Sequence, residues 1–349
     1  METSGLEKEG IIKSSFRALC KGFFSFFGAS ICILIVIGFI GFTVNSTTSK
    51  SYFTIEPDAN YKKDLTALSA PAILKIDISG IIGAGKMTTS DIQSLLNDSR
   101  DGVLKNNRVK GILLCIDTPG GSVTDSNGIF QAIKDYKERY KVPVYAYVDG
   151  MCASGGMYIS SAADKIFASP VSIIGSVGVI LGPVFNFQKL MESIGVKAKT
   201  IAKGKDKAML NPFTTWKEGE DESLVTITDY LYSHFVDVVL AARPNMNKEK
   251  LINDYGAQVY AAPTALEYGY IDNANATYTT ALENLLEACN IKTSDKYQVV
   301  QLKSYQPFFS DLVGSRLDGL VIKSFYKLFG INENAYELKD PFLYLYSVN

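Results

Sequence analysis

Two glycine-rich turns carry the residues of this chain whose types and spacing could do chemistry. Residues 117–122 read DTPGGS, and residues 149–156 read DGMCASGG. Each turn follows a strand-like run and precedes a helix-like one, which leaves backbone N–H groups at a helix start able to hold an anion or stabilise an oxyanion. Neither turn matches a phosphate-binding motif. The second turn also offers a hydroxyl nucleophile, Ser154, among small residues that let a substrate backbone approach.

Both turns also have a purely structural interpretation. Pro-Gly-Gly is common in ordinary tight turns, and a serine at a helix start can simply cap the helix. A nucleophilic serine needs a base, and the single histidine, His234, lies 234 − 154 = 80 positions further on in a helix-like segment. One histidine also excludes sites built from several imidazoles, such as a tri-histidine zinc site. A lysine can serve as the base instead when desolvation favours its neutral form.

Lysines that could take this role lie in residues 202–212, which read AKGKDKAMLNP. Lys203, Lys205 and Lys207 share parity, so an extended segment would direct all three to one side, and periodicity does not choose among them. Only Lys207 directly precedes an apolar run, the setting best able to desolvate an ammonium group. The alternative is a solvated basic loop without a catalytic role.

The overall composition restricts the class of protein. The chain has 349 residues, of which 47% are hydrophobic and 20% are charged, enough apolar material for a globular core. Lys and Arg total 35 against 36 Asp and Glu, so the charge balance gives no sign of nucleic-acid binding. The five cysteines include no C-x-x-C pair, which excludes a zinc ribbon and argues against a disulfide framework.

An uncharged apolar segment, residues 22–44, predicts an N-terminal transmembrane helix. A helix of that length is about 34 Å long and spans a hydrocarbon core of roughly 30 Å. Lys13, Arg17 and Lys21 precede it, so the positive-inside rule places residues 1–21 in the cytoplasm and the later residues outside it. A cleavable signal peptide is the alternative, but its apolar core would be about 7–15 residues long and would end at an A-x-A-like site, which we do not find. We therefore expect an uncleaved anchor in the cell membrane.

The remaining sequence predicts a linker, an α/β domain and a C-terminal extension. Residues 45–70 are polar and predict a juxtamembrane linker, residues 71–290 alternate strand and helix patterns, and residues 291–349 have no assigned role. Continuous apolar strands are typical of a sheet covered on both faces, and repeated β-turn-α units imply an α/β domain with right-handed crossovers. The expected strands are 72–78, 109–116, 143–148, 165–168 and 197–202, and the expected helices include 89–104, 157–163, 187–194, 217–242 and an amphipathic one at 310–330.

Together these features resemble the signal peptide peptidase A family of membrane-anchored Ser-Lys proteases. The resemblance runs through residues 72–275 and includes the N-terminal anchor. The family commonly has Asn-Ser where this chain has Asp117-Thr118, and often an acid after the lysine where this chain has Ala208. The matching blocks are IDTPGGS at 116–122, ASGGMYIS at 153–160, AADKI at 162–166, GSVGV at 175–179, and Lys207 ahead of Pro212.

The resemblance implies a ClpP/crotonase-like fold and assigns roles to the turn residues. Ser154 would be the nucleophile, and Lys207, 207 − 154 = 53 positions downstream, the general base. Gly120 and Gly121 would contribute to the oxyanion hole beside the amide of Gly155. The family further implies a ring-shaped homo-oligomer in which the lysine of one protomer can serve its neighbour's serine. Its substrates are remnant signal peptides in the membrane and other unfolded or hydrophobic segments, and no metal or organic cofactor is required.

We therefore expect a membrane-anchored serine endopeptidase with an extracytoplasmic catalytic domain, periplasmic if the cell is Gram-negative, that acts on peptides and not on nucleic acid. One alternative keeps the fold without the activity, as a membrane-anchored scaffold or peptide-binding ring. Another is an acyl-CoA enzyme of the crotonase type, because that fold uses similar paired amides. The membrane anchor and the pairing of Ser154 with Lys207 argue against the acyl-CoA enzyme.

Overall fold

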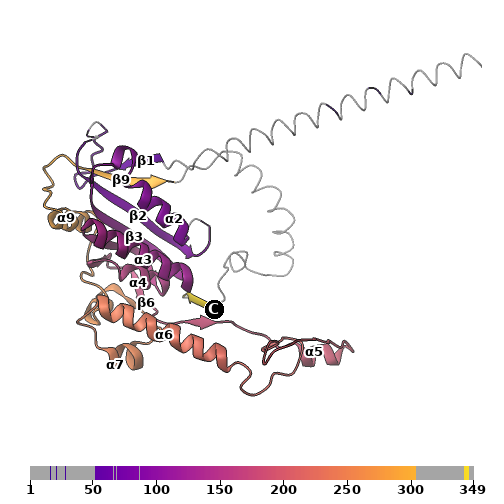
Figure 1. Cartoon of the computed structure of the whole chain (residues 1–349). Helices are drawn as coiled ribbons and strands as arrows, with labels where there is room; N and C mark the ends of the chain where they lie inside the picture. Colours follow the sequence, from indigo (N-terminus) through magenta and orange to yellow (C-terminus); the bar gives the residue numbers. More distant parts are fainter. Residues whose placement is uncertain are drawn as a thin grey trace, which may run out of the picture. The chain divides into compact units, whose positions relative to one another are not determined.

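The structure of this chain is a computed structural model, shown in Figure 1. It describes residues 52–303 except 66, 68 and 86, together with residues 342–345 and the single residues 16, 21 and 28. The described residues from 52 onwards belong to one compact unit. The predicted transmembrane segment, apart from residue 28, and the predicted amphipathic helix at 310–330 lie outside the described residues.

One mixed β-sheet organises the described part of the chain. Its strands lie in the order β1, β9, β2, β3, β4, β6 and β8, with β5 paired to β4 and with β10 paired to both β3 and β7. Strands β2 to β6 pair in parallel, whereas β1 and β8 pair antiparallel at the two ends of this order. The strands are β1 (Tyr52–Glu56), β2 (Ala72–Ile82), β3 (Val109–Ser122), β4 (Val144–Ala153), β5 (Lys165–Ala168), β6 (Ile173–Gly175), β7 (Ile180–Leu181), β8 (Val259–Ala261), β9 (Gln298–Lys303) and β10 (Phe342–Leu345).

Helices alternate with the parallel strands, which confirms the predicted α/β class. Helices α2, α3 and α4 lie between β2 and β5 in the sequence, as the β-turn-α pattern predicts. The helices are α2 (Thr89–Asp98), α3 (Val123–Tyr140), α4 (Gly155–Ser160), α5 (Gln188–Ser193), α6 (Glu222–Ala242), α7 (Lys248–Lys250), α8 (Ala262–Glu267) and α9 (Tyr278–Ala288), with a 3₁₀ turn at Gly102–Leu104 and a π turn at Leu251–Tyr255.

The sheet is covered on both faces, as its continuous apolar strands predict. Ile112, Leu113 and Leu114 of β3 are all fully buried, although successive side chains of a strand point to opposite faces. Ile112 and Leu114 pack in the core cluster that contains α2, α3 and α4, while Leu113 packs in the cluster that contains α9. Gly111 allows α9 to approach, because a Cβ there would lie 2.7 Å from Cys289 Sγ.

The region from β7 to the start of α6 projects away from this core. Helix α5 buries none of its residues, and α6 buries only Phe235, Val236 and Val239, which lie in its second half. Figure 1 draws α5 apart from the sheet, beyond the free end of α6. Among the described residues, α6 is long and apolar enough to cross a membrane by length and composition alone. The region also exposes large apolar side chains, among them Val184, Phe185, Phe187, Leu190, Ile194, Val196, Ile201 and Phe213.

Several predicted boundaries differ from the structure. The predicted strand at 197–202 is wrong, because these residues are exposed and no neighbouring strand pairs with them. The helix predicted to start at Lys217 starts at Glu222, after Gly219 adopts a positive φ of 72°. The sheet also extends beyond residues 71–290, since β1 lies in the predicted linker and β9 in the predicted extension.

Candidate active site

Ser154 occupies a strained turn between β4 and α4. Its backbone has φ 54° and ψ −113°, a combination that L-residues rarely adopt and that clusters at functional sites. Its N–H donates to the carbonyl of Gly175 at 2.9 Å, and its carbonyl accepts from the N–H of Tyr158 at 3.0 Å, so both neighbouring elements hold the turn. The side chain is buried and makes no capping hydrogen bond to α4. The helix-cap interpretation of Ser154 is therefore not supported.

The first glycine turn packs directly against this serine turn. A Cβ on Gly156 would lie 2.7 Å from Thr118 Cγ2, so the start of α4 and the end of β3 touch. Thr118 is fully buried, and its Oγ1 accepts from the N–H of Gly120 at 3.0 Å and donates to the carbonyl of Gly80. A Cβ on Gly121 would lie 2.0 Å from the carbonyl oxygen of Ile82. No larger residue fits at Gly121 without moving β2.

Asp117 ties the two turns together at the mouth of the site. Its Oδ1 accepts from the N–H of Met151 at 2.9 Å, across the gap between β3 and β4. Gly150 passes so close that a Cβ would lie 2.3 Å from the same carboxylate oxygen. Beyond the turn, Ser122 Oγ accepts from the N–H of Asp125 at 3.1 Å and caps α3. These contacts join the turn that contains Gly120 to the turn that contains Ser154, and we call the two joined turns the platform.

An extended segment of the same chain lies next to this platform. Strand β4 pairs with β3 as far as Thr118 and Cys152 and then turns away at Ser154. Beyond that point β10 pairs with β3, placing residues 343–345 opposite Ser122, Gly121 and Gly120. On its other edge β10 pairs with β7, and it also contacts α4. A strand-shaped slot between β3 and β7, hereafter the slot, therefore begins where β4 ends, and Figure 1 shows β10 beside the end of the chain.

The three candidate lysines lie in an irregular and exposed segment. Lys203, Lys205 and Lys207 are all solvent-exposed, and Lys205 forms a loose ion pair with Asp206 at 3.9 Å. Among the described residues, no hydrogen bond or ion pair joins the side chain of Lys207 to Ser154 or to any other residue. The apolar run after Lys207 is half-buried, but in the single chain it does not bury the ammonium group.

His234 and Cys152 are two other side chains with groups that can react. His234 is exposed on α6, where its ring stacks on Tyr230 and lies 6.3 Å from the ring of Tyr158, and no described hydrogen bond links it to Ser154. Cys152 is fully buried, and this burial raises the pKa of its thiol to about 12. A thiol in that state stays protonated near neutral pH and is a poor nucleophile.

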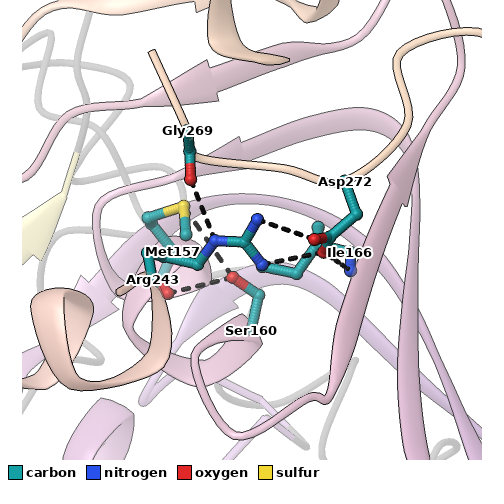
Figure 2. A network of polar contacts seen from close by, with 6 residues as sticks. All are labelled: Met157, Ser160, Ile166, Arg243, Gly269 and Asp272. Atoms are coloured by element: carbon teal, nitrogen blue, oxygen red, sulfur yellow. Dashed lines mark hydrogen bonds and ion pairs between the residues drawn. The ribbon is translucent and has the colours of Figure 1, made fainter. Parts of the chain in front are cut away.

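An ion pair joins the end of α6 to the loop before α9 and to β5, and sequence reasoning did not identify it. The guanidinium of Arg243, at the end of α6, donates to both carboxylate oxygens of Asp272 at 2.8 and 3.0 Å and to the carbonyl of Gly269 at 2.9 Å. Asp272 also accepts from the N–H of Ile166 in β5 at 2.7 Å (Figure 2). Within α4, the hydroxyl of Ser160 donates to the carbonyl of Met157 at 2.9 Å (Figure 2).

Other functional features of the site could not be read from the sequence. The roles of Thr118 and Asp117 depend on contacts with Gly80 and Met151, and the slot depends on strands far apart in the chain. The only signal was the position of Asp117 and Thr118 inside the first glycine turn. Among the described residues, no group of three or more His, Cys, Asp or Glu side chains is placed to hold a metal ion.

A strained serine at a strand-to-helix turn is the arrangement by which a class of serine hydrolases presents its nucleophile. Comparison with known proteins supports a serine peptidase. The family model for peptidase family S49 matches residues 136–292. A candidate protease of Synechocystis sp. is 32% identical over 200 residues, which cover 57% of this chain and 68% of that protein. The chain belongs to peptidase family S49.

Two further similarities complete the comparison. A candidate signal peptide peptidase SppA of Enterococcus faecium is 30% identical over 225 residues, which cover 63% of this chain and 62% of that protein. The chain thus spans a little under two thirds of the length of that relative. Among solved structures, a mutant of the 1510-N membrane-bound stomatin-specific protease in complex with a substrate peptide matches at 19% identity and a TM-score of 0.40, covering 72% of this chain and 99% of that one.

Proposed function

We propose that this chain is a membrane-anchored serine endopeptidase that hydrolyses peptide bonds in extended, hydrophobic segments such as remnant signal peptides. The observation that carries the proposal is the strained, buried Ser154 at the start of a slot that holds four residues in β-conformation. A peptide that binds in the slot satisfies its backbone groups on both edges, which is how β-strand addition recognises unfolded chains.

The reaction follows the usual two steps of serine acyl transfer. Ser154 Oγ attacks the scissile carbonyl carbon while neutral Lys207 Nζ takes the hydroxyl proton. When the tetrahedral intermediate collapses, Lys207 returns this proton to the leaving amine, and the acyl group stays on Ser154. Water then attacks the ester, again giving a proton to Lys207, and the second collapse releases the carboxylic acid and restores the serine hydroxyl.

The oxyanion would be held by backbone amides of the two turns. The N–H of Gly120 already donates to Thr118 Oγ1, so its use would break a buried hydrogen bond. We therefore assign the oxyanion to the amides of Gly121 and Gly155, with Gly120 shaping the turn through its positive φ of 102°.

The base requires a change in the surroundings of Lys207. The residue is exposed in the single chain, on the region that also exposes Phe185, Phe187 and Leu190. Burial of these apolar side chains in a ring-shaped homo-oligomer would remove water from Lys207, which favours the neutral amine. In such a ring the lysine of one protomer serves the serine of its neighbour. The anchor at 22–44 would hold the ring at the membrane, with the catalytic domain on the extracytoplasmic side.

The full chain in detergent, mixed with apolar reporter peptides, tests this proposal. Ser154→Ala should abolish cleavage, and a serine-directed reagent should form its adduct on Ser154 and on no other residue. Cleavage by Ser154→Ala at the unmodified rate, or an adduct elsewhere, would overturn it.

The exposure of Lys207 favours one second candidate, a peptide-binding ring without hydrolytic activity. Lys207→Ala separates the two. Loss of peptide cleavage with normal assembly supports the enzyme, whereas full cellular function of the variant supports the binding ring.

A further inference from the structure

A cavity of about 370 Å³ lies beside the slot, on the side of β7. Leu181 is common to both, because it lines the cavity and also pairs with residue 342 across the antiparallel β7–β10 ladder. Directly opposite positions of such a ladder project to the same face of the sheet. Any peptide that takes the place of β10 therefore presents one side chain to the face that carries the cavity. We call this the Leu181 position of the peptide.

The wall of the cavity is aliphatic. It is formed by half-buried Leu181, Leu210 and Leu224, with the more exposed Val184 and Val225. Leu210 is fixed in this wall by its backbone, because its N–H donates to a carboxylate oxygen of Glu220 at 2.9 Å. This wall offers hydrophobic contact to a methylene chain that enters the cavity.

Three polar residues of α6 and its start complete the lining: Thr228, whose hydroxyl donates to the carbonyl of Leu224, and two carboxylates, Asp221 at the start of the helix and Asp229 two turns later. Asp229 is exposed and Asp221 is half-buried. Within the part of the chain that the structure describes, neither side chain makes a hydrogen bond or an ion pair. Both carboxylates are therefore available to a cation that enters the cavity.

An aliphatic wall with acidic groups matches a side chain that has an apolar stem and a cationic end. Lysine and arginine bury their methylene stems against apolar surface while their charged ends reach polar partners. From this match we infer that the cavity is a specificity pocket for a lysine or arginine side chain of the substrate at the Leu181 position. The inference rests on the proposed peptidase function and adds to it the class of side chain that is recognised.

The test uses the full chain in detergent and a set of neutral apolar peptides through which a single lysine is moved one position at a time. One position should raise kcat/KM by about tenfold over the same peptide with norleucine there, a gain of about 1.4 kcal/mol in transition-state binding. The segment 342–345 competes equally with every peptide, so the ratio between peptides is unaffected by it.

Variants of Asp221 and Asp229 test whether these two carboxylates cause the preference for the lysine peptide. In the double variant Asp221→Asn with Asp229→Asn, kcat/KM for the lysine peptide should fall to the value for the norleucine peptide. Asp135→Asn removes an exposed carboxylate of α3, a helix that does not line the cavity, and should keep the preference. Asp229→Lys should favour glutamate at the same position.

Binding of the same peptides to Ser154→Ala, followed by fluorescence anisotropy, tests the pocket without hydrolysis. If peptides are cleaved or bound with no dependence on the lysine position, or if the preference survives the double Asn variant, the pocket assignment is wrong. If the unmodified chain binds the lysine peptides selectively but cleaves none of them, the pocket stands and the peptidase proposal fails.

Discussion

Thr118 and Gly120 are joined by a hydrogen bond of 3.0 Å in which the buried threonine hydroxyl accepts from the glycine amide. The same hydroxyl donates to the carbonyl of Gly80, so one side chain satisfies two backbone groups and fixes the turn beside Ser154. The chain uses threonine here and thereby also gains a methyl group in contact with the start of α4, where a Cβ on Gly156 would lie 2.7 Å from it.

Replacing this hydroxyl should impair turnover more than substrate binding. Thr118→Val keeps the shape but leaves the amide of Gly120 and the carbonyl of Gly80 without their partner, which costs about 1–3 kcal/mol of stability. We expect kcat to fall by at least about tenfold, because a loosened turn holds the oxyanion less well, with KM changed little. Thr118→Ser should recover most of the rate. Steady-state kinetics and melting temperatures measure both effects, and an unimpaired Val variant would show that the hydroxyl does not position the turn.

The segment 342–345 should compete with substrate for the slot. Leu343 is paired on both edges, with Ser122 of β3 and with Ile180 of β7, so its N–H faces a partner strand on either side and Leu343→Pro must remove a pairing group. We expect this variant to lower the apparent KM for a short reporter peptide several-fold while kcat stays the same. Leu343→Ala keeps the backbone groups and serves as the control. An unchanged KM in the proline variant would mean that the segment does not compete with substrate.

The thiol of Cys152 should not take part in the reaction. Burial raises its pKa to about 12, so it stays protonated at the pH of any ordinary assay. Cys152→Ala should retain cleavage of reporter peptides, and iodoacetamide should label Cys152 only after unfolding. Rapid labelling of the folded chain at pH 8, read by mass spectrometry, would contradict this.

One buried and two half-buried thiols should also make the fold less stable in alkali. Cys115, Cys152 and Cys289 each have a pKa raised to about 12, with burial as the main cause. The unfolded chain releases these protons from about pH 9, whereas the folded chain keeps them. The folded state therefore loses stability as the pH rises from about 9 to 12, and these groups do not affect its stability below pH 8. Melting temperatures across this range should fall less steeply for Cys152→Ala than for the unmodified chain. If the melting temperatures of the two proteins fall equally steeply with pH, the thiol of Cys152 does not cause the loss of stability.

The ion pair between Arg243 and Asp272 should stabilise the fold more than an exposed pair does. Arg243→Met leaves a partly buried carboxylate without its two guanidinium hydrogen bonds, and since Asp272 is 34% exposed we expect a cost of about 2–3 kcal/mol, below that of a fully buried pair. Lys248→Met breaks the exposed pair with Asp237 and should cost less than about 1 kcal/mol. Denaturant unfolding of the two variants measures this difference, and equal costs would contradict it.

Local patterns were sufficient to predict the centre of the fold and the candidate nucleophile. The apolar run at 109–116 predicted a strand covered on both faces, because consecutive side chains of a strand point to opposite faces and nearly all of them are apolar here. Ser154 became a candidate because of its small neighbours, and the family resemblance gave it the role of nucleophile, which stays a prediction; its strained backbone is a local property of the strand-to-helix turn.

Features that depend on contacts between distant segments could not be predicted in the same way. The alternating residues 197–202 have the local character of a strand, but a strand also needs a neighbour, and here the chain supplies none. The pairing of β10 with β3 joins residues more than two hundred positions apart, so no local pattern reports it. Likewise, the sequence can suggest Lys207 as a base, but its exposure depends on what packs over it.

The two-sided pairing of the slot has a consequence for which proteins could be attacked. An occupant must offer unpaired N–H and C=O groups to β3 over three consecutive residues and to β7 over two, and a residue inside a helix or a sheet has already committed those groups. Natively folded proteins would not bind in the slot, even without an inhibitor. Segments that have unfolded, or that never folded, would bind there. The choice of substrate would then depend on the conformational state of the substrate. A protein with such a slot could lie beside folded proteins on a crowded membrane surface without cleaving them.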